Sequence, residues 1–199
     1  MPAQTVKDIK KDIYLLLNKA GQMLELTEEA FAKNKVSSLD QADELAREIH
    51  SKEDALTEVL AKLASSDAEG RTLLPVPGYV EKIATSIERI MDNTRGKIKD
   101  ALLVSDKGMQ ETAKLFSATR EVLKKAGEAV VTGTKAGADA VVKESDAVIN
   151  MSNDFATSHE DRLVTGECSP KSSSMYLCVL YAFEDIAGHA KEVTKKLSK

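Results

Sequence analysis

The 199-residue sequence has no tryptophan, only four prolines and two cysteines, and just 4% aromatic residues. Few aromatic residues beside many Ala, Leu, Lys and Glu residues favour helix over sheet. The longest uninterrupted apolar run is the nine residues from Met175 to Phe183. Because a membrane-spanning helix needs about 20 residues, the sequence predicts a soluble, helical protein.

Charge and cysteine usage exclude further classes of protein. The net charge is −4, and acidic and basic residues alternate without a strongly basic block. This distribution gives no electrostatic footprint for nucleic acid. Cys168 and Cys178 form no zinc-binding pattern, so we interpret them as free thiols in a reducing cytoplasm. The N-terminal stretch lacks the apolar core of a secretory signal, which also predicts a cytoplasmic protein.

Apolar residues recur at alternating steps of three and four residues along most of the chain. This spacing is typical of helices that bury one face, and no segment shows the alternation of a strand. The sequence therefore predicts an all-α protein with six long helices. They cover roughly residues 5–34, 38–65, 80–101, 109–130, 138–163 and 176–197.

Local signals mark where these helices begin and end. Thr5 with Asp8 fits an N-cap for the first helix, and Ser38 with Gln41 fits a capping box for the second. The stretch from Ser65 to Pro77 contains a glycine and two prolines and is predicted to be a loop.

The third and sixth predicted helices resemble each other. At an offset of 96 residues, residues 78–98 lie over residues 174–194, their seam positions coincide, and Glu88 falls on Glu184. All amphipathic helices share such seams, so chance is one explanation; the shared glutamate and the similar preceding loops favour a true repeat. The sequence then predicts two tandem three-helix bundles. Their predicted limits are residues 1–104 and 105–199.

Four side chains of the first repeat form a candidate metal site. Glu88 and Asp92 are spaced i,i+4, which puts two carboxylates on one helix face about 6 Å apart. His50 and Asp54 repeat this spacing on the preceding helix. If the two helices pack side by side, the four converge on a divalent or iron-type metal ion through oxygen and imidazole ligands. The alternative is a solvated bundle edge, where basic residues pair with the acids.

The second repeat offers a weaker version of this site. Its candidate ligands are Asp146, Glu184 and His189. Gly188 stands at the position that matches Asp92, which removes one carboxylate. The alternative for His189 is an edge histidine hydrogen-bonded to a neighbouring carboxylate.

Catalytic motifs are missing from the sequence. It has no Glu-x-x-His pair of the di-iron bundles, no Gly-x-Ser-x-Gly, no phosphate-binding loop and no His-Glu-x-x-His. We therefore expect a protein that is not an enzyme.

Segments of the last third carry a family resemblance. Residues 159–163 read His-Glu-Asp-Arg-Leu, Gly166 opens Gly-Glu-Cys, and Phe183 to Ala190 read Phe-Glu-Asp-Ile-Ala-Gly-His-Ala. A fainter copy covers residues 87–92. In these segments the chain resembles the PhoU family of phosphate-transport regulators, and within it the PhoU-like domain at the C-terminal end of sodium/phosphate cotransporters.

The resemblance implies two three-helix bundles and a function in phosphate homeostasis. Some members bind metal through a Glu/Asp-x-x-x-Asp motif, which Glu88 and Asp92 match. The resemblance implies a cytoplasmic regulator that acts by contact with a phosphate transporter or sensor kinase, and that meets a membrane only through such a partner. The alternatives are a cytosolic domain of a sodium/phosphate cotransporter and a metal-binding helical bundle. The broad apolar seams suit a homodimer as well as a monomer.

Overall fold

The computed structural model describes residues 5–196, and this part of the chain is helical with no strand. The all-α prediction is confirmed, with one short helix beyond the six long ones. The helices are α1 (Val6–Lys33), α2 (Val36–Leu63), α3 (Ala68–Leu73), α4 (Val76–Lys99), α5 (Asp106–Thr132), α6 (Lys135–Val164) and α7 (Pro170–Lys195). Leu197, the end of the sixth predicted helix, lies outside the described residues. No helix within residues 5–196 is both long and apolar enough to cross a membrane.

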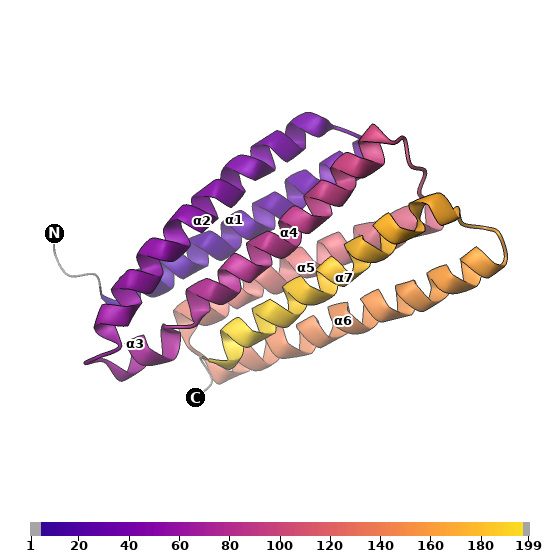
Figure 1. Ribbon diagram of the computed structural model, residues 1–199. Coiled ribbons are helices and arrows are strands. Elements are labelled where there is room, and N and C mark those ends of the chain that lie inside the picture. The colour runs from indigo at the N-terminus through magenta and orange to yellow at the C-terminus, as the bar shows by residue number, and fades with distance from the viewer. Residues whose placement is uncertain (1–4, 197–199) are drawn as a thin grey trace.

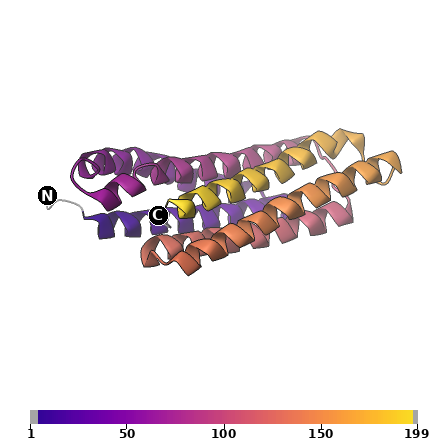
Figure 2. The same cartoon turned by 90° about the horizontal axis from the view of Figure 1, so that it is seen from below.

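The long helices form two three-helix bundles that pack against each other. The first repeat consists of α1 to α4 and the second of α5 to α7. Figure 1 shows α2, α4, α7 and α6 side by side, with α1 and α5 behind them. In Figure 2, α1 and α5 again lie together on one side of the molecule. The repeats meet where α1 packs on α5 and α4 packs on α7. The two predicted bundles are therefore present.

The predicted seams form one continuous core that passes through both bundles. Ile13 and Leu17 of α1 are fully buried, as is Val179 of α7, and all three belong to the same apolar cluster. Three aromatic rings mark the path between the repeats. Phe31 of α1 lies 6.2 Å from Phe116 of α5, which meets Phe183 of α7 edge to face at 4.8 Å between ring centroids. The division of the chain at residues 104 and 105 stays a prediction.

The predicted N-cap of the first helix is confirmed. The Asp8 amide donates to Thr5 Oγ1 at 3.3 Å, and the Thr5 amide donates back to Asp8 Oδ2 at 3.0 Å. The predicted capping box at Ser38 is wrong, because α2 already begins at Val36. The Ser38 hydroxyl is buried and donates to Glu29 Oε2 of α1 at 2.6 Å. The Ser38 side chain therefore links α2 to α1 and does not cap its own helix.

The predicted loop from Ser65 to Pro77 contains the short helix α3. Asp67 caps this helix by accepting a hydrogen bond from the Gly70 amide at 2.7 Å. Pro77 lies in the first turn of α4. Proline is tolerated there because the amides of that turn have no partner within the helix. The glycine and the two prolines of this stretch are thus compatible with both helices, α3 and α4.

Lys97 is an unusual member of the core of the first repeat. Its side chain is only 5% exposed. The ammonium group donates to the Phe31 carbonyl at 2.9 Å and to Asn34 Oδ1 at 2.7 Å, and it lies 5.0 Å from the Phe31 ring. Asn34 ends α1 in the left-handed conformation at φ 55°. Lys97 thus places a positive charge where the dipole of α1 is negative.

Candidate functional site

The predicted site residues of the first repeat lie on the exposed face of α2 and α4. His50 of α2 points between two glutamates of α4. Its Nδ1 lies 2.8 Å from both carboxylate oxygens of Glu81, and its Nε2 lies 3.1 Å from Glu88 Oε1. Burial disfavours the charged ring, but the hydrogen bonds and charges of both glutamates outweigh it and raise the pKa of His50. The three side chains form a charged bridge between the helices.

The structure does not bring the other two predicted ligands into this bridge. Asp54 is exposed on α2. Asp92 of α4 is 75% exposed and accepts from Arg95 at 3.1 Å. Arg95 also reaches across to Asp43 of α2 at 2.5 Å. A second bridge therefore joins α2 and α4 nearer the end of the bundle, with a guanidinium at its centre.

The candidates of the second repeat are spread over α6 and α7. Asp146 of α6 forms an ion pair with Lys191 of α7. Glu184 is half-buried on α7. His189 lies 6.4 Å from Tyr79 of α4, measured between ring centroids. Burial, and the positive charges of nearby basic residues, lower its pKa although Asp185 opposes this. These three residues do not form a common site.

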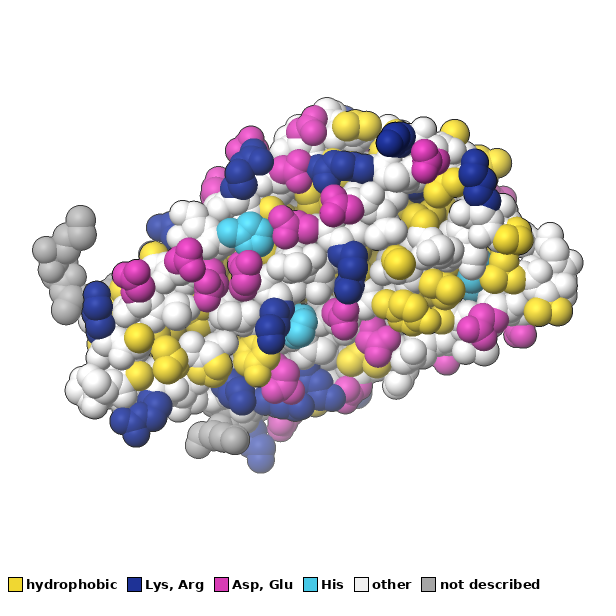
Figure 3. All heavy atoms as spheres, in the orientation of Figure 1, with side chains coloured by type: hydrophobic (Ala, Val, Ile, Leu, Met, Phe, Trp, Pro, Cys, Tyr) yellow, Lys and Arg dark blue, Asp and Glu magenta, His cyan; other side chains and the backbone are white. Residues whose placement is uncertain are grey.

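Seen as a surface, this face carries charges of both signs. Figure 3 shows acidic side chains gathered over α2 and α4, with basic side chains among them and an apolar area over α7. Arg89 of α4 forms an ion pair with Asp185 of α7, which ties the two repeats together across the face. The two residues are 96 positions apart, which is the repeat offset. They therefore occupy matching positions in the two repeats.

The second repeat also contains a buried polar cluster that the sequence reading missed. Glu111 of α5 is 2% exposed and accepts from both terminal nitrogens of Arg162 of α6, at 3.0 and 2.7 Å. The Tyr176 hydroxyl of α7 donates to the same carboxylate at 2.5 Å. Burial and the Glu111 charge raise the pKa of Tyr176, so its hydroxyl stays a donor. One carboxylate thus joins all three helices of the repeat.

A cavity of about 410 Å³ opens beside this cluster. His159 is buried in its wall, where its Nε2 bonds Ser173 Oγ at 2.9 Å and its ring lies 4.7 Å from the Tyr176 ring. Cys168 also lines the cavity and accepts from Arg162 Nε at 3.4 Å. Cys168 and Cys178 are free thiols. His159, Arg162 and Cys168, which belong to the segments that carry the family resemblance, therefore organise the end of the bundle.

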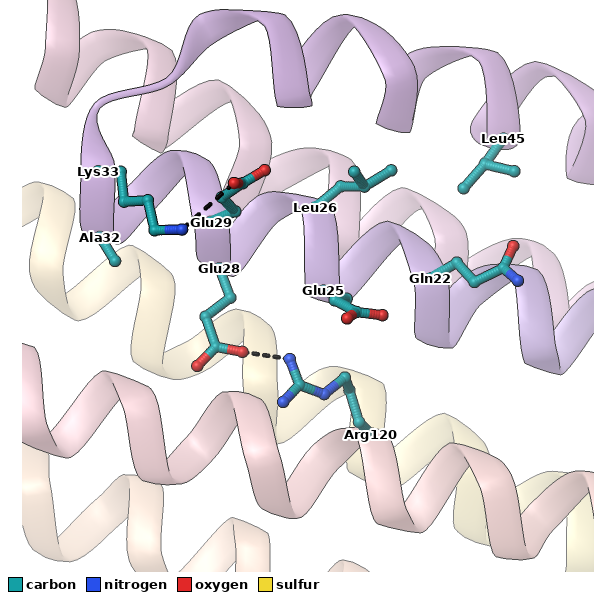
Figure 4. A pocket seen from close by; sticks show the side chains of 9 residues that line it. All are labelled: Gln22, Glu25, Leu26, Glu28, Glu29, Ala32, Lys33, Leu45 and Arg120. Atoms are coloured by element: carbon teal, nitrogen blue, oxygen red, sulfur yellow. Dashed lines mark hydrogen bonds and ion pairs between the residues drawn. The ribbon is translucent and has the colours of Figure 1, made fainter.

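A wider groove, of about 680 Å³, lies between α1, α2 and α5 (Figure 4). Three glutamates of α1 line it. Glu28 forms an ion pair with Arg120 of α5, and Glu29 accepts from Ser38, Lys35 and Lys33. These hydrogen bonds, that from Ser38 first, lower the pKa of Glu29 to about 2. Two of the three carboxylates thus hold helices together.

No protein-family model matches the chain, and no curated protein matches it. Solved structures do match its fold. The phosphate transport system regulatory protein PhoU from Streptococcus pneumoniae superimposes with a TM-score of 0.84 at 10% identity, over 96% of this chain and 92% of that chain.

PhoU from Pseudomonas aeruginosa gives a TM-score of 0.83 at 13% identity, over 96% of this chain and 93% of that chain. The protein therefore belongs to the class of all-helical, two-bundle folds. Within this class it has the PhoU fold along nearly its whole length, as the sequence resemblance predicted. At these identities the likeness establishes the fold alone.

Proposed function

We propose that this protein is a non-enzymatic, cytoplasmic regulator of phosphate transport that acts by contact with a phosphate transporter or its sensor kinase. The observation that carries the proposal is the match of 96% of the chain to two PhoU structures, one of them described as a phosphate transport system regulatory protein. The family resemblance in residues 159–190 points to the same function. A helical bundle with long exposed faces suits work by protein contact.

Cross-linking in cells tests the proposed contact. The full chain is tagged, cells are grown with limiting and with abundant phosphate, and the captured proteins are probed for the phosphate transporter and for the sensor kinase. We expect at least one of them to be captured, in an amount that changes with phosphate supply. Failure to capture either one under both conditions contradicts the proposal.

A genetic measurement provides the matched control. Deletion of the gene should change phosphate uptake, and the intact chain should restore it. The variant Phe183→Asp places a carboxylate in the fully buried core and is expected to lose both the fold and the rescue. Phosphate uptake that does not change on deletion contradicts the proposed regulation.

Two further expectations stay predictions. The cotransporter alternative predicts a membrane domain encoded in frame upstream, which the neighbouring reading frame tests directly. A homodimer predicts twice the chain mass in light scattering.

A further inference from the structure

The carboxylates that match the metal motif already have basic partners within the chain. In the first repeat, Arg95 donates to Asp92 at 3.1 Å and to Asp43 at 2.5 Å. The guanidinium therefore lies between a carboxylate of α4 and one of α2. A metal ion shared by the two helices would need this same position, because it attracts the same oxygens.

The second pair of carboxylates in this repeat cannot converge on one ion. Glu81 bonds Nδ1 of His50, and Glu88 bonds Nε2. These two nitrogens point to different sides of the imidazole ring, so the ring separates the carboxylates. A metal ion takes one lone pair from a histidine nitrogen and needs its other ligands around the same point. Carboxylate oxygens only accept hydrogen bonds, so both bonds form together only when each ring nitrogen carries a proton and the ring is cationic.

In the second repeat, a lysine takes the position that Arg95 has in the first. Lys191 forms an ion pair with Asp146 of α6. Lys191 lies 96 residues after Arg95, so the repeat offset relates the two basic residues. Gly188 occupies the position that matches Asp92. In both repeats, therefore, the last helix sends one basic side chain to an acidic side chain of the middle long helix.

These donor sets do not fit a metal ion. Within residues 5–196, no three His, Cys, Asp or Glu side chains come together in a way that could hold one. We infer that this chain is a metal-independent version of the PhoU fold, in which Arg95, His50 and Lys191 supply the positive charge between the helices. The inference stands on the ion-pair geometry and holds whichever partner the protein regulates.

Metal analysis of the full chain, purified without chelator, gives the first test. We expect less than about 0.1 metal ion per chain and a melting temperature that moves by less than about 1 °C with EDTA or with added Mn²⁺, Fe²⁺ or Zn²⁺. One metal ion per chain together with a lower melting temperature in EDTA overturns the inference. This outcome leaves the proposed regulatory function intact.

Removing the internal cations gives the second test. The double variant Arg95→Gln with Lys191→Gln frees Asp43, Asp92 and Asp146. We expect it to melt at a lower temperature than the wild type and to recover part of the loss in Mn²⁺, while the wild type does not respond.

The control is Lys19→Gln, which removes a basic residue of α1 that pairs with Glu48 away from the motif positions. It should show no response to Mn²⁺. A wild type whose melting temperature rises in Mn²⁺ by more than that of the control overturns the inference. If the double variant does not fold, the metal analysis of the wild type decides.

Discussion

The two repeats share an architecture but place their charged bridges at different depths. In the first repeat, His50 and Glu81 lie on the surface, with side chains 33% and 35% exposed. In the second repeat, Glu111 is 2% exposed and its partner Arg162 is 11% exposed. Two bundles of the same architecture thus hold one bridge that water screens and one that is nearly dry.

The difference in depth predicts a difference in energy. Exposed ion pairs contribute about 0–1 kcal/mol, because solvent screens the attraction and two side chains lose freedom. Breaking a buried pair costs about 3–5 kcal/mol, because the remaining charge has neither water nor a partner. Stability should therefore depend more on the end of the second bundle than on the charged face of the first.

The largest effect is expected for Arg162→Ala. This change leaves the Glu111 carboxylate buried with only the Tyr176 hydroxyl as a donor, and should lower the free energy of unfolding by about 3–5 kcal/mol in urea denaturation. The triple variant Glu111→Leu, Arg162→Met, Tyr176→Phe removes every charge and should recover most of the loss. Equal losses in both proteins would show that packing, and not the stranded charge, governs this site.

The buried cation of the first repeat should matter less. Lys97→Met keeps the apolar stem but removes the donor to the Phe31 carbonyl and Asn34, which should cost about 1–3 kcal/mol. No carboxylate is stranded, so the loss should be smaller than for Arg162→Ala. Lys99→Met, on the exposed side of the same helix turn, is the control and should change stability by less than about 0.5 kcal/mol. Urea denaturation of the three variants tests this order. A larger loss of stability for Lys97→Met than for Arg162→Ala would contradict it.

The histidines of the two repeats should respond to pH in opposite directions. The folded pKa of His50 is raised above 6.5, so its contribution is present below pH 6.5 and is lost as the pH rises through the folded value. The folded pKa of His159 is lowered by burial, and further by the charge of Arg162. Its contribution is therefore present above pH 6.5 and is lost as the pH falls through the folded value.

Unfolding free energies of wild type, His50→Gln and His159→Gln between about pH 5 and 8 test these signs. The advantage of wild type over His50→Gln should shrink with rising pH, by about 1 kcal/mol or less. Its advantage over His159→Gln should shrink with falling pH. If the stability difference from wild type changed with pH in the same direction for both variants, the two histidines would differ less than their surroundings indicate.

The smallest effect is expected for Arg89→Ala, although it breaks the ion pair between the repeats. The side chains of Arg89 and Asp185 are 45% and 49% exposed. The loss should stay below about 1 kcal/mol and shrink further in 1 M salt. A loss comparable to that of Arg162→Ala would show that surface pairs contribute more here than solvent screening allows.

The sequence predicts the long helices well because their seams repeat over many turns. Val80, Ile83, Ile87 and Ile90 recur at helical spacing and are all fully buried. The short helix α3 has only six residues, too few for periodicity to distinguish it from a loop. Ser38 misled the prediction, since a serine before an apolar run signals a cap but here bonds a residue of the preceding helix.

The polar contacts are harder to predict, because they depend on how neighbouring helices are aligned. Spacing alone places Glu88 and Asp92 on one face, but the structure brings His50 to Glu88 and Glu81 and leaves Asp92 to Arg95. Glu81 lies seven residues before Glu88, so helical spacing alone could have predicted that the two glutamates share one helix face.

Glu111 and Arg162 are 51 residues apart, and only the relative register of α5 and α6 brings them together. No local sign in the sequence indicates that Glu111 is buried. Its buried neighbours on α5 are Gly108, Thr112 and Leu115, and only Leu115 is a large apolar residue.

The Phe116 ring contacts the first repeat through Phe31 and its own repeat through Phe183. Without α5 and α7, part of the apolar faces of α1 and α4 would lie in water, because one continuous core runs through both repeats. The two halves are therefore expected to melt together in a single cooperative transition, in which the loss of one removes the support of the other.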